Sequence, residues 1–171
     1  MPALREPAAL DDLLLYRLSR LLSVGGSMVI RLCEGRFGIT RREWRVIARL
    51  AQEHELLSSE LAERIQLDRA RTSRAVSSLV AKKLVRRQTG TADRRQARLA
   101  LTDKGRTLHH ALFPLVRDVN QGLLAPLSAA EARQLDAMLT RLQARADAMV
   151  EQADLPKADR RRGGRAQLAM G

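Results

Sequence analysis

The sequence predicts a mainly α-helical protein with a small β-wing. Apolar residues recur at steps of three and four near both ends of the chain, which is typical of amphipathic helices. In the middle, a basic helical stretch is followed by two short strand-like runs joined by a polar turn. This order predicts a winged helix-turn-helix between N- and C-terminal dimerisation helices. Hydrophobic residues make up 45% of the 171 residues, enough for a buried core, whereas aromatic residues make up only 2%.

The positive charge is concentrated in one stretch. The chain has 31 Lys and Arg against 19 Asp and Glu, a net charge of +12. Between Arg69 and Arg98 ten basic residues stand against one acid, Asp93, so this stretch carries nine of the twelve net charges. Such a concentration indicates a polyanionic partner, nucleic acid before membrane, rather than a uniformly solubilising surface.

Other features limit the function classes. The single cysteine, Cys33, excludes an intrachain disulfide and suits a reducing cytoplasm. No signal peptide and no apolar run of about 20 residues is apparent, so we expect no membrane partner. His109 and His110 are adjacent on a helix and diverge, so no metal or other cofactor is expected. No phosphate-binding glycine loop or activated nucleophile is recognisable, and an enzyme is not expected.

Five segments are predicted along the chain. Residues 1–9 form a flexible N-terminus, and residues 10–34 form a dimerisation helix with a kink or a close helix approach at Gly25 and Gly26. Residues 35–102 are the winged helix-turn-helix, entered through a loop from Gly35 to Gly38. Residues 103–151 form the C-terminal dimerisation helices, with a kink or break at Pro114. Residues 152–171 form a disordered basic tail.

Capping residues predict where helices begin, because a side-chain oxygen can accept a hydrogen bond from the first helical N–H groups. Two caps have a Glu three residues later, Glu43 and Glu131, which is the capping-box spacing. The predicted caps are Thr40, Ser58, Asp68, Thr102 and Ser128. The helix after Asp68 should run to about Lys83, with inward positions Ala75, Val76, Leu79 and Val80.

The helix-turn-helix is predicted from the short helix 58–64 and the basic helix 69–83, which would enter the major groove. Arginine pairs with guanine, and hydroxyl groups bind phosphate oxygens. Between the strands, a wing tip with two arginines suits the minor groove, and Asp93 would orient one of them. The predicted DNA-binding residues are Ser58, Arg69, Arg71, Thr72, Ser73, Arg74, Ser77, Arg87, Arg94 and Arg95.

Several stretches together resemble the MarR family of bacterial transcription regulators. They are Ser-Ser-Glu-Leu-Ala-Glu-Arg at 58–64, Thr-Ser-Arg-Ala-Val-Ser-Ser-Leu at 72–79, Leu-Val-Arg-Arg at 84–87, Asp-Arg-Arg at 93–95 and Leu-Thr-Asp-Lys-Gly at 101–105. The resemblance covers about residues 10–150 and implies a homodimer, a palindromic operator and release by a small molecule. It also implies that Arg74 reads a base and that Arg94 or Arg95 enters the minor groove. The tail after Leu155 is not part of the family pattern.

Two apolar stripes favour a dimer independently. The stripe from Leu135 to Val150 has few partners within one winged helix, and the stripe from Leu10 to Leu32 is long. Packing the terminal helices of two copies would bury both and set two recognition helices about 34 Å apart. An intrachain helix bundle is the alternative. The predicted dimerisation residues are Leu14, Leu18, Leu135, Leu139, Leu142 and Met149.

A ligand pocket is expected from the resemblance, where the first, second and fifth helices meet the DNA-binding lobe. The overall likeness to family members that regulate nicotinate breakdown suggests a hydroxynicotinate-like compound, and an arginine suits its carboxylate. The candidate lining residues are Arg17, Met28, Trp44, His110, Phe113 and Arg117.

The sequence therefore predicts a regulator that binds double-stranded DNA sequence-specifically, a repressor released by a small aromatic carboxylate. A non-specific or architectural DNA-binding protein is one alternative. A redox-sensing repressor based on Cys33 is another, since Arg31 and Arg36 would lower the pKa of its thiol. The apolar surroundings of Cys33 favour a buried, inert thiol instead. Single-strand or RNA binding is disfavoured because too few aromatic residues are present for base stacking.

Overall fold

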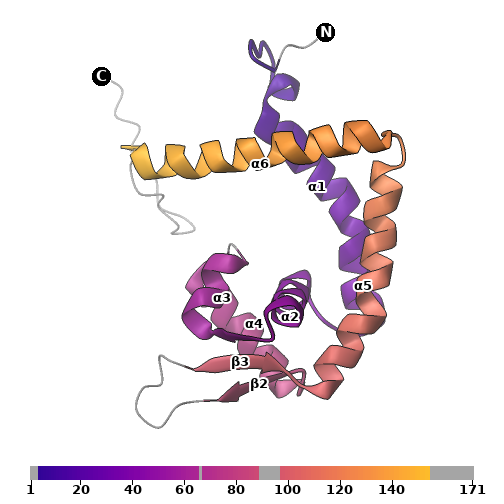
Figure 1. The fold of residues 1–171 in the computed structure, drawn as a ribbon, viewed down its shortest axis with the longest axis vertical. Coiled ribbons are helices and arrows are strands. Elements are labelled where there is room, and N and C mark those ends of the chain that lie inside the picture. Colours follow the sequence, from indigo (N-terminus) through magenta and orange to yellow (C-terminus); the bar gives the residue numbers. More distant parts are fainter. Residues whose placement is uncertain (1–3, 66, 89–96, 155–171) are drawn as a thin grey trace, which may run out of the picture. The chain divides into compact units, whose positions relative to one another are not determined.

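Residues 4–65, 67–88 and 97–154 are described by the structure, a computed structural model. The chain divides into two units, Met1–Ala125 and Pro126–Gly171. The first unit holds the winged helix-turn-helix together with the long helices on either side of it in the sequence, and the second holds one long helix (Figure 1).

The elements of the first unit follow the predicted order. A 3-10 turn, Leu10–Asp12, precedes α1, and a π-helical turn, Leu32–Arg36, follows it. The helices are α1 (Leu14–Arg31), α2 (Arg41–Glu53), α3 (Ser58–Arg64), α4 (Arg69–Ala81) and α5 (Asp103–Leu124). The strands are β1 (Glu55–Leu57), β2 (Val85–Gln88) and β3 (Arg98–Leu101). The mainly helical fold with a small wing is confirmed.

The sheet contains a strand that the sequence did not predict. Its order is β1-β3-β2, and both pairings are antiparallel. Leu56 of β1 lies opposite Leu99, and Val85 of β2 lies opposite Leu101. The sequence predicted only the two strands on either side of the wing tip. The strand has only three residues, and its hydrogen-bonding partner lies more than forty residues later in the sequence.

The core lies between the sheet and helices α2 to α4. Its fully buried side chains include Ile47, Leu61, Leu79 and Leu99, and Leu112 joins them from α5. The inward positions Ala75, Val76 and Leu79 of α4 are confirmed. Val80 was wrongly predicted to face inward, because 37% of its surface is exposed.

Most of the predicted caps are confirmed. Glu43 N–H donates to Thr40 Oγ1 at 3.2 Å, and Thr40 N–H donates back to Glu43 Oε2 at 2.6 Å. The same N-cap hydrogen bond is made by Asp68, Thr102 and Ser128. Ser58 is the exception: Leu57 is the N-cap of α3, and Ser58 is the first helical residue.

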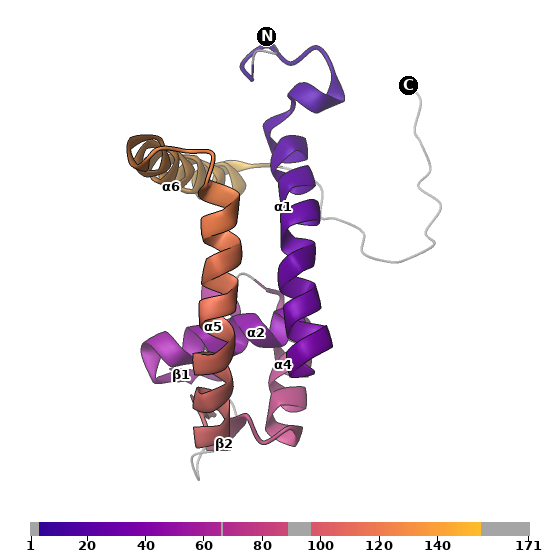
Figure 2. The same cartoon turned by 90° about the vertical axis from the view of Figure 1, so that its right-hand side faces the viewer.

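The long helices continue through the glycines and the proline at which the sequence predicted a kink or a break. Helix α1 is continuous through Gly25, where a Cβ would lie 3.2 Å from Leu123 of α5, so Gly25 provides a close helix approach. Figure 2 shows α1 and α5 side by side. Helix α5 runs through Pro114, which excludes a break there. The predicted loop begins later than Gly35, because Gly35 belongs to the π-helical turn.

The start of α5 packs directly on the backbone that leaves α4. A Cβ at Gly105 would overlap the carbonyl oxygen of Leu84. Thr102 N–H donates to the same oxygen at 3.1 Å, and Thr102 Oγ1 donates to the carbonyl oxygen of Lys83 at 2.8 Å. These contacts explain structurally why a Thr and a Gly occur in the Leu-Thr-Asp-Lys-Gly stretch.

The second unit consists of α6 (Ala129–Gln152), which begins at the Ser128–Glu131 capping box. Its apolar side chains Met138, Leu139, Leu142 and Met149 are between 43% and 53% exposed. Over residues 4–65, 67–88 and 97–154, no helix combines the length and the apolar character that crossing a membrane requires.

We expect Gly105→Ala to lower the free energy of unfolding by about 1–3 kcal/mol, because the new methyl group overlaps the Leu84 carbonyl. Gly122→Ala in the same helix is the matched control. A Cβ added at Gly122 would meet no atom within 4 Å, and the change should be neutral or stabilise the helix by about 0.5–1 kcal/mol. Urea unfolding measures both, and equal stability of Gly105→Ala and the unmodified protein would contradict the close approach.

Candidate nucleic-acid interface

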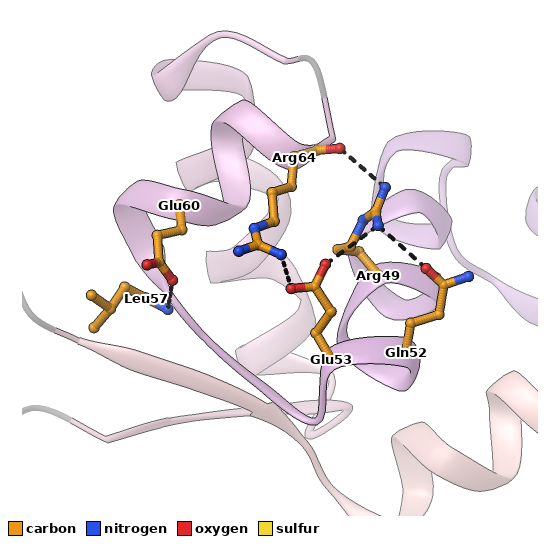
Figure 3. A network of polar contacts seen from close by, with 6 residues as sticks. All are labelled: Arg49, Gln52, Glu53, Leu57, Glu60 and Arg64. Atoms are coloured by element: carbon orange, nitrogen blue, oxygen red, sulfur yellow. Dashed lines mark hydrogen bonds and ion pairs between the residues drawn. The ribbon is translucent and has the colours of Figure 1, made fainter. Parts of the chain in front are cut away.

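Helix α3, the first helix of the helix-turn-helix, is fixed to the end of α2 by a polar network (Figure 3). Arg49 donates from Nη1 to Glu53 Oε1 and from Nη2 to the carbonyl oxygen of Arg64, both at 3.3 Å. Arg64 in turn forms an ion pair with Glu53. The hydrogen bond from Arg64 lowers the pKa of the Glu53 carboxyl below its ordinary value. The network therefore joins the last residue of α3, just before the turn to α4, to the end of α2.

Helix α4 is fixed to the start of α2 by a buried carboxylate. Glu43 is only 2% exposed, and Lys82 Nζ lies 2.9 and 3.0 Å from its two oxygens. Lys82 also donates to the carbonyl oxygen of Gly38 at 2.9 Å. Burial alone would raise the pKa of Glu43. The hydrogen bonds from Ser78, Thr40 and Lys82, together with the Lys82 charge, outweigh burial and lower the pKa.

The C-terminal end of α4 turns sharply into β2. Lys83 has a left-handed backbone conformation, with φ 59°. Leu84 N–H donates to the carbonyl oxygen of Leu79 and Lys83 N–H donates to that of Val80, both at 2.9 Å. This is the Schellman pattern that ends many helices, with Lys83 in place of the usual glycine. It directs the chain from the recognition helix straight into the wing.

The predicted DNA contacts on α4 fall into three groups. Arg74 and Ser77 are exposed and lie opposite the buried stripe, while Arg69 and Ser73 are exposed on one flank. Arg71 lies on the other flank, and its Nε is 3.1 Å from Asp68 Oδ2. Thr72 does not share the exposed face. It is 2% exposed, and its hydroxyl donates to the carbonyl oxygen of Asp68 at 3.0 Å.

The remaining predicted contacts lie on α3 and the wing. Ser58 is half-buried at the start of α3, and its N–H donates to the carbonyl oxygen of Ala97 at 3.0 Å. Arg87 is exposed on β2, and so is its neighbour Arg86, which we did not include. Arg94 and Arg95 lie outside the described residues. The described surface therefore combines a basic helix face and a basic strand within one small frame.

Known proteins resemble this helix-turn-helix region in sequence and in structure. Residues 37–96 match the family model described as MarR family. A probable transcriptional regulator from Pseudomonas aeruginosa has a similar structure, with 26% identity and a TM-score of 0.69 over 78% of this chain and 99% of that one. Residues 37–96 of the chain thus match the MarR family, and the surrounding fold resembles that of a transcriptional regulator. No curated protein matches the chain.

Two further solved structures resemble this chain. The PcaV transcriptional regulator from Streptomyces coelicolor, in complex with its natural ligand, is 25% identical, with a TM-score of 0.68 over 82% of this chain and 99% of PcaV. BpsR from Bordetella bronchiseptica, whose DNA binding is regulated by 6-hydroxynicotinic acid, shares the fold at 20% identity, with a TM-score of 0.64 over 74% of this chain and 98% of BpsR. The likeness supports a DNA-binding transcriptional regulator.

An aromatic row links α2 to α5. The ring of His109 stacks on Trp44 at 5.6 Å and on Phe113 at 5.3 Å between centroids. We named His110 rather than His109, yet His110 only meets the edge of the His109 ring. Burial, followed by the neighbouring His110, lowers the pKa of His109. Phe113 lies four residues after His109, so the two side chains share one face of the helix. This spacing would have identified His109 from the sequence, which we missed.

The other candidate ligand residues are not gathered at this row. Arg17 lines a shallow hollow of about 310 Å³ along α1 with Arg20, Leu21 and Val24. Met28 lies on α1 and is 42% exposed, and Arg117 lies on α5. The structure thus brings together Trp44 and Phe113 but not the six candidates as one site.

Cys33 lies in the core, in the π-helical turn that follows α1, with no exposed surface. Burial, and then the charge of Glu34, raises the pKa of its thiol to about 11, against a smaller opposing effect of Arg41. Arg31 and Arg36 were expected to lower it, but neither governs the shift. A protonated, inaccessible thiol is a poor nucleophile, which argues against the redox-sensing alternative. Among the described residues, no group of three or more His, Cys, Asp or Glu side chains is arranged to hold a metal ion.

We expect Glu43→Gln to destabilise the domain by about 1–3 kcal/mol at neutral pH, because Lys82 loses its charged partner. A glutamate with a lowered pKa stabilises the fold above its ordinary titration range, and this contribution is lost as the pH falls through the lowered pKa. The difference between Glu43→Gln and the unmodified protein should therefore shrink in acid. Urea unfolding at several pH values measures it, with the exposed Glu63→Gln as control. A difference that is independent of pH would show that the charge of Glu43 contributes nothing.

Proposed function

We propose that the protein is a homodimeric repressor that binds a palindromic operator in double-stranded DNA and is released by a small aromatic carboxylate. The exposed face of α4 carries this proposal. Arg69, Ser73, Arg74 and Ser77 project from a helix that is fixed at its C-terminal end by the Lys82–Glu43 pair. Arginine and hydroxyl groups on a rigid helix are suited to bases and phosphates in the major groove.

The exposed apolar surface supports the dimer. Leu18 on α1 is 37% exposed, and Leu139 and Leu142 on α6 are each 43% exposed. Apolar stripes on two long helices would be covered by a second copy of the chain. Two recognition helices about 34 Å apart would then match successive turns of the same DNA face.

The aromatic acid effector is supported by the related proteins and by the aromatic row. DNA binding by BpsR is regulated by 6-hydroxynicotinic acid, and PcaV was solved with its natural ligand. In this chain, Trp44 at one end of the aromatic row lines a cavity of about 450 Å³ with Arg45 and Arg49 of α2, and Phe113 at the other end is 43% exposed. An effector that binds there would contact both α2, which holds the recognition helix, and α5.

The deciding measurement is the affinity for DNA upstream of the protein's own gene, beside a scrambled duplex of equal length at the same physiological salt. A preference of about a thousandfold or more supports a specific regulator. Near-equal affinities, reproduced with sites from a genome-wide binding map, would favour an architectural DNA-binding protein, which the net charge of +12 also allows.

Arg74→Ala should weaken operator binding by about 1–3 kcal/mol and relax the preference at one base position, because Arg74 projects from the outward face of α4. Arg133→Ala, on the polar face of α6, removes the same charge and should leave affinity and preference unchanged. Gel-shift titrations against a set of single-base operator variants measure both. An Arg74→Ala protein with unaltered base preference would remove Arg74 from the reading role.

Leu142→Arg should dissociate the dimer, because it places a charge in the middle of the apolar stripe of α6. Ala144→Arg adds the same side chain about half a helical turn away and should leave the dimer intact. Sedimentation velocity reports both masses. A dimer that tolerates Leu142→Arg would show that this stripe is not at the interface.

A further inference from the structure

A second basic cavity lies on the side of α4 that faces α2. Its volume is about 430 Å³, and it is formed by the end of α1, the start of α2 and the start of α4. Four arginines line it, together with one acid, one threonine and two apolar side chains. The lining residues are Ile30, Glu34, Thr40, Arg41, Arg42, Arg45, Leu67 and Arg71.

The positive charges of this cavity are largely unneutralised. Within the described part of the chain, no carboxylate forms an ion pair with Arg41, Arg42 or Arg45. Partial burial, and then the charges of Arg41 and Arg42, lowers the pKa of Arg45. Clustered like charges disfavour one another, and an anion placed between them removes that cost.

The cavity is separate from the surface that reads DNA. Arg71 and Ser78 are seven residues apart, about two helical turns, so they lie on the same flank of α4. Ser78 bonds to Glu43 of α2, which shows that this flank faces α2. Arg74 and Ser77 point away from the core instead, so an anion beside Arg71 would not occupy the outward face.

We propose that the arginine-lined cavity between α1, α2 and α4 binds a small organic anion with at least two negative charges. A guanidinium group binds a carboxylate or phosphate through paired hydrogen bonds, and Arg41, Arg42 and Arg45, which form no ion pair within the described residues, exceed what one carboxylate neutralises. Ile30 and Leu67 provide contact for an apolar body, and the volume is that of a small-molecule site. This anion site differs from the aromatic row and extends the proposed effector response to a second site.

Arg71 couples the cavity to the recognition helix. Its guanidinium pairs with Asp68, and the same carboxylate caps α4 by accepting from Arg71 N–H at 2.8 Å. An anion that recruits the Arg71 side chain competes with Asp68 at the first turn of α4, where Arg69, Ser73 and Arg74 begin the DNA-reading face. Because coupling between two ligands is reciprocal, the anion would weaken DNA binding and DNA would weaken anion binding. This coupling rests on the proposed function; the anion site itself does not.

Calorimetry with the full-length protein at constant ionic strength tests the site. The probes are benzene-1,2-dicarboxylate, benzoate with one charge, and inorganic pyrophosphate without an apolar body. We expect the dicarboxylate to bind at least about tenfold more tightly than benzoate. Arg41→Gln combined with Arg42→Gln should remove this advantage, whereas Arg133→Gln combined with Arg141→Gln, an equal loss of charge on α6, should keep it.

Two results would overturn the anion site. One is that neither benzene-1,2-dicarboxylate nor pyrophosphate, the two probes with more than one charge, binds. The other is that binding survives Arg41→Gln with Arg42→Gln but is lost in Arg49→Gln, which alters the neighbouring cavity beside Trp44. Unchanged circular dichroism and unfolding midpoints for each variant establish that the fold is retained.

A gel-shift titration with and without the dicarboxylate tests the coupling. Release of wild-type protein from DNA but not of the Arg41→Gln, Arg42→Gln protein supports it. If that double variant instead binds DNA weakly and the wild type binds no anion, these arginines contact the DNA backbone and the proposal is wrong. Since calorimetry needs no DNA, failure to find an operator leaves the test of the anion site intact.

Discussion

The buried carboxylate of Glu43 determines how the recognition helix is held. It caps its own helix through Thr40 and, with Lys82, joins the start of α2 to the end of α4. A carboxylate that is 2% exposed is tolerated only when its oxygens are fully hydrogen-bonded, so few orientations of α4 against α2 are compatible with it. The outward direction of Arg74 and Ser77 follows from this packing, because the opposite side of α4 must face the core.

The two ends of α4 are held unequally. At the C-terminal end, the Lys82–Glu43 pair, the Schellman turn at Lys83 and the contact of Leu84 with Gly105 all restrict movement. At the N-terminal end, the described contacts include the cap and ion pair of Asp68, whose partner Arg71 is 53% exposed. Exposed ion pairs contribute little, typically under about 1 kcal/mol. The polar contacts described at the N-terminal end are therefore weaker than those at the C-terminal end, although the buried side chains of Thr72 and Val76 still hold this part of α4 in the core.

The sequence predicted those features that depend on neighbours in the chain. The caps at Thr40, Asp68, Thr102 and Ser128 need only hydrogen bonds to residues a few positions away, and the wing follows from alternating apolar residues. What it missed depends on distant partners: β1 exists because Leu56 pairs with Leu99, and Ser58 is not the cap because Leu57 already occupies the extended conformation at that boundary. His109 was passed over for His110 because only the tertiary fold shows which ring stacks on Trp44.

Helix α2 contacts α3, α4 and α5, because consecutive residues point about 100° apart around it. Glu43 contacts α4, Trp44 stacks on a ring from α5, and Arg45 faces the arginine-lined cavity. One turn later, Arg49 and Glu53 hold α3. Since the Glu43–Lys82 pair resists separation, α2 and the C-terminal end of α4 must move together. Under the proposed function, a ligand acting on α2 from the aromatic row would shift this pair as a body, whereas an anion at Arg71 would act on the N-terminal end of α4. The two proposed sites would then alter the same proposed DNA-reading face by different movements.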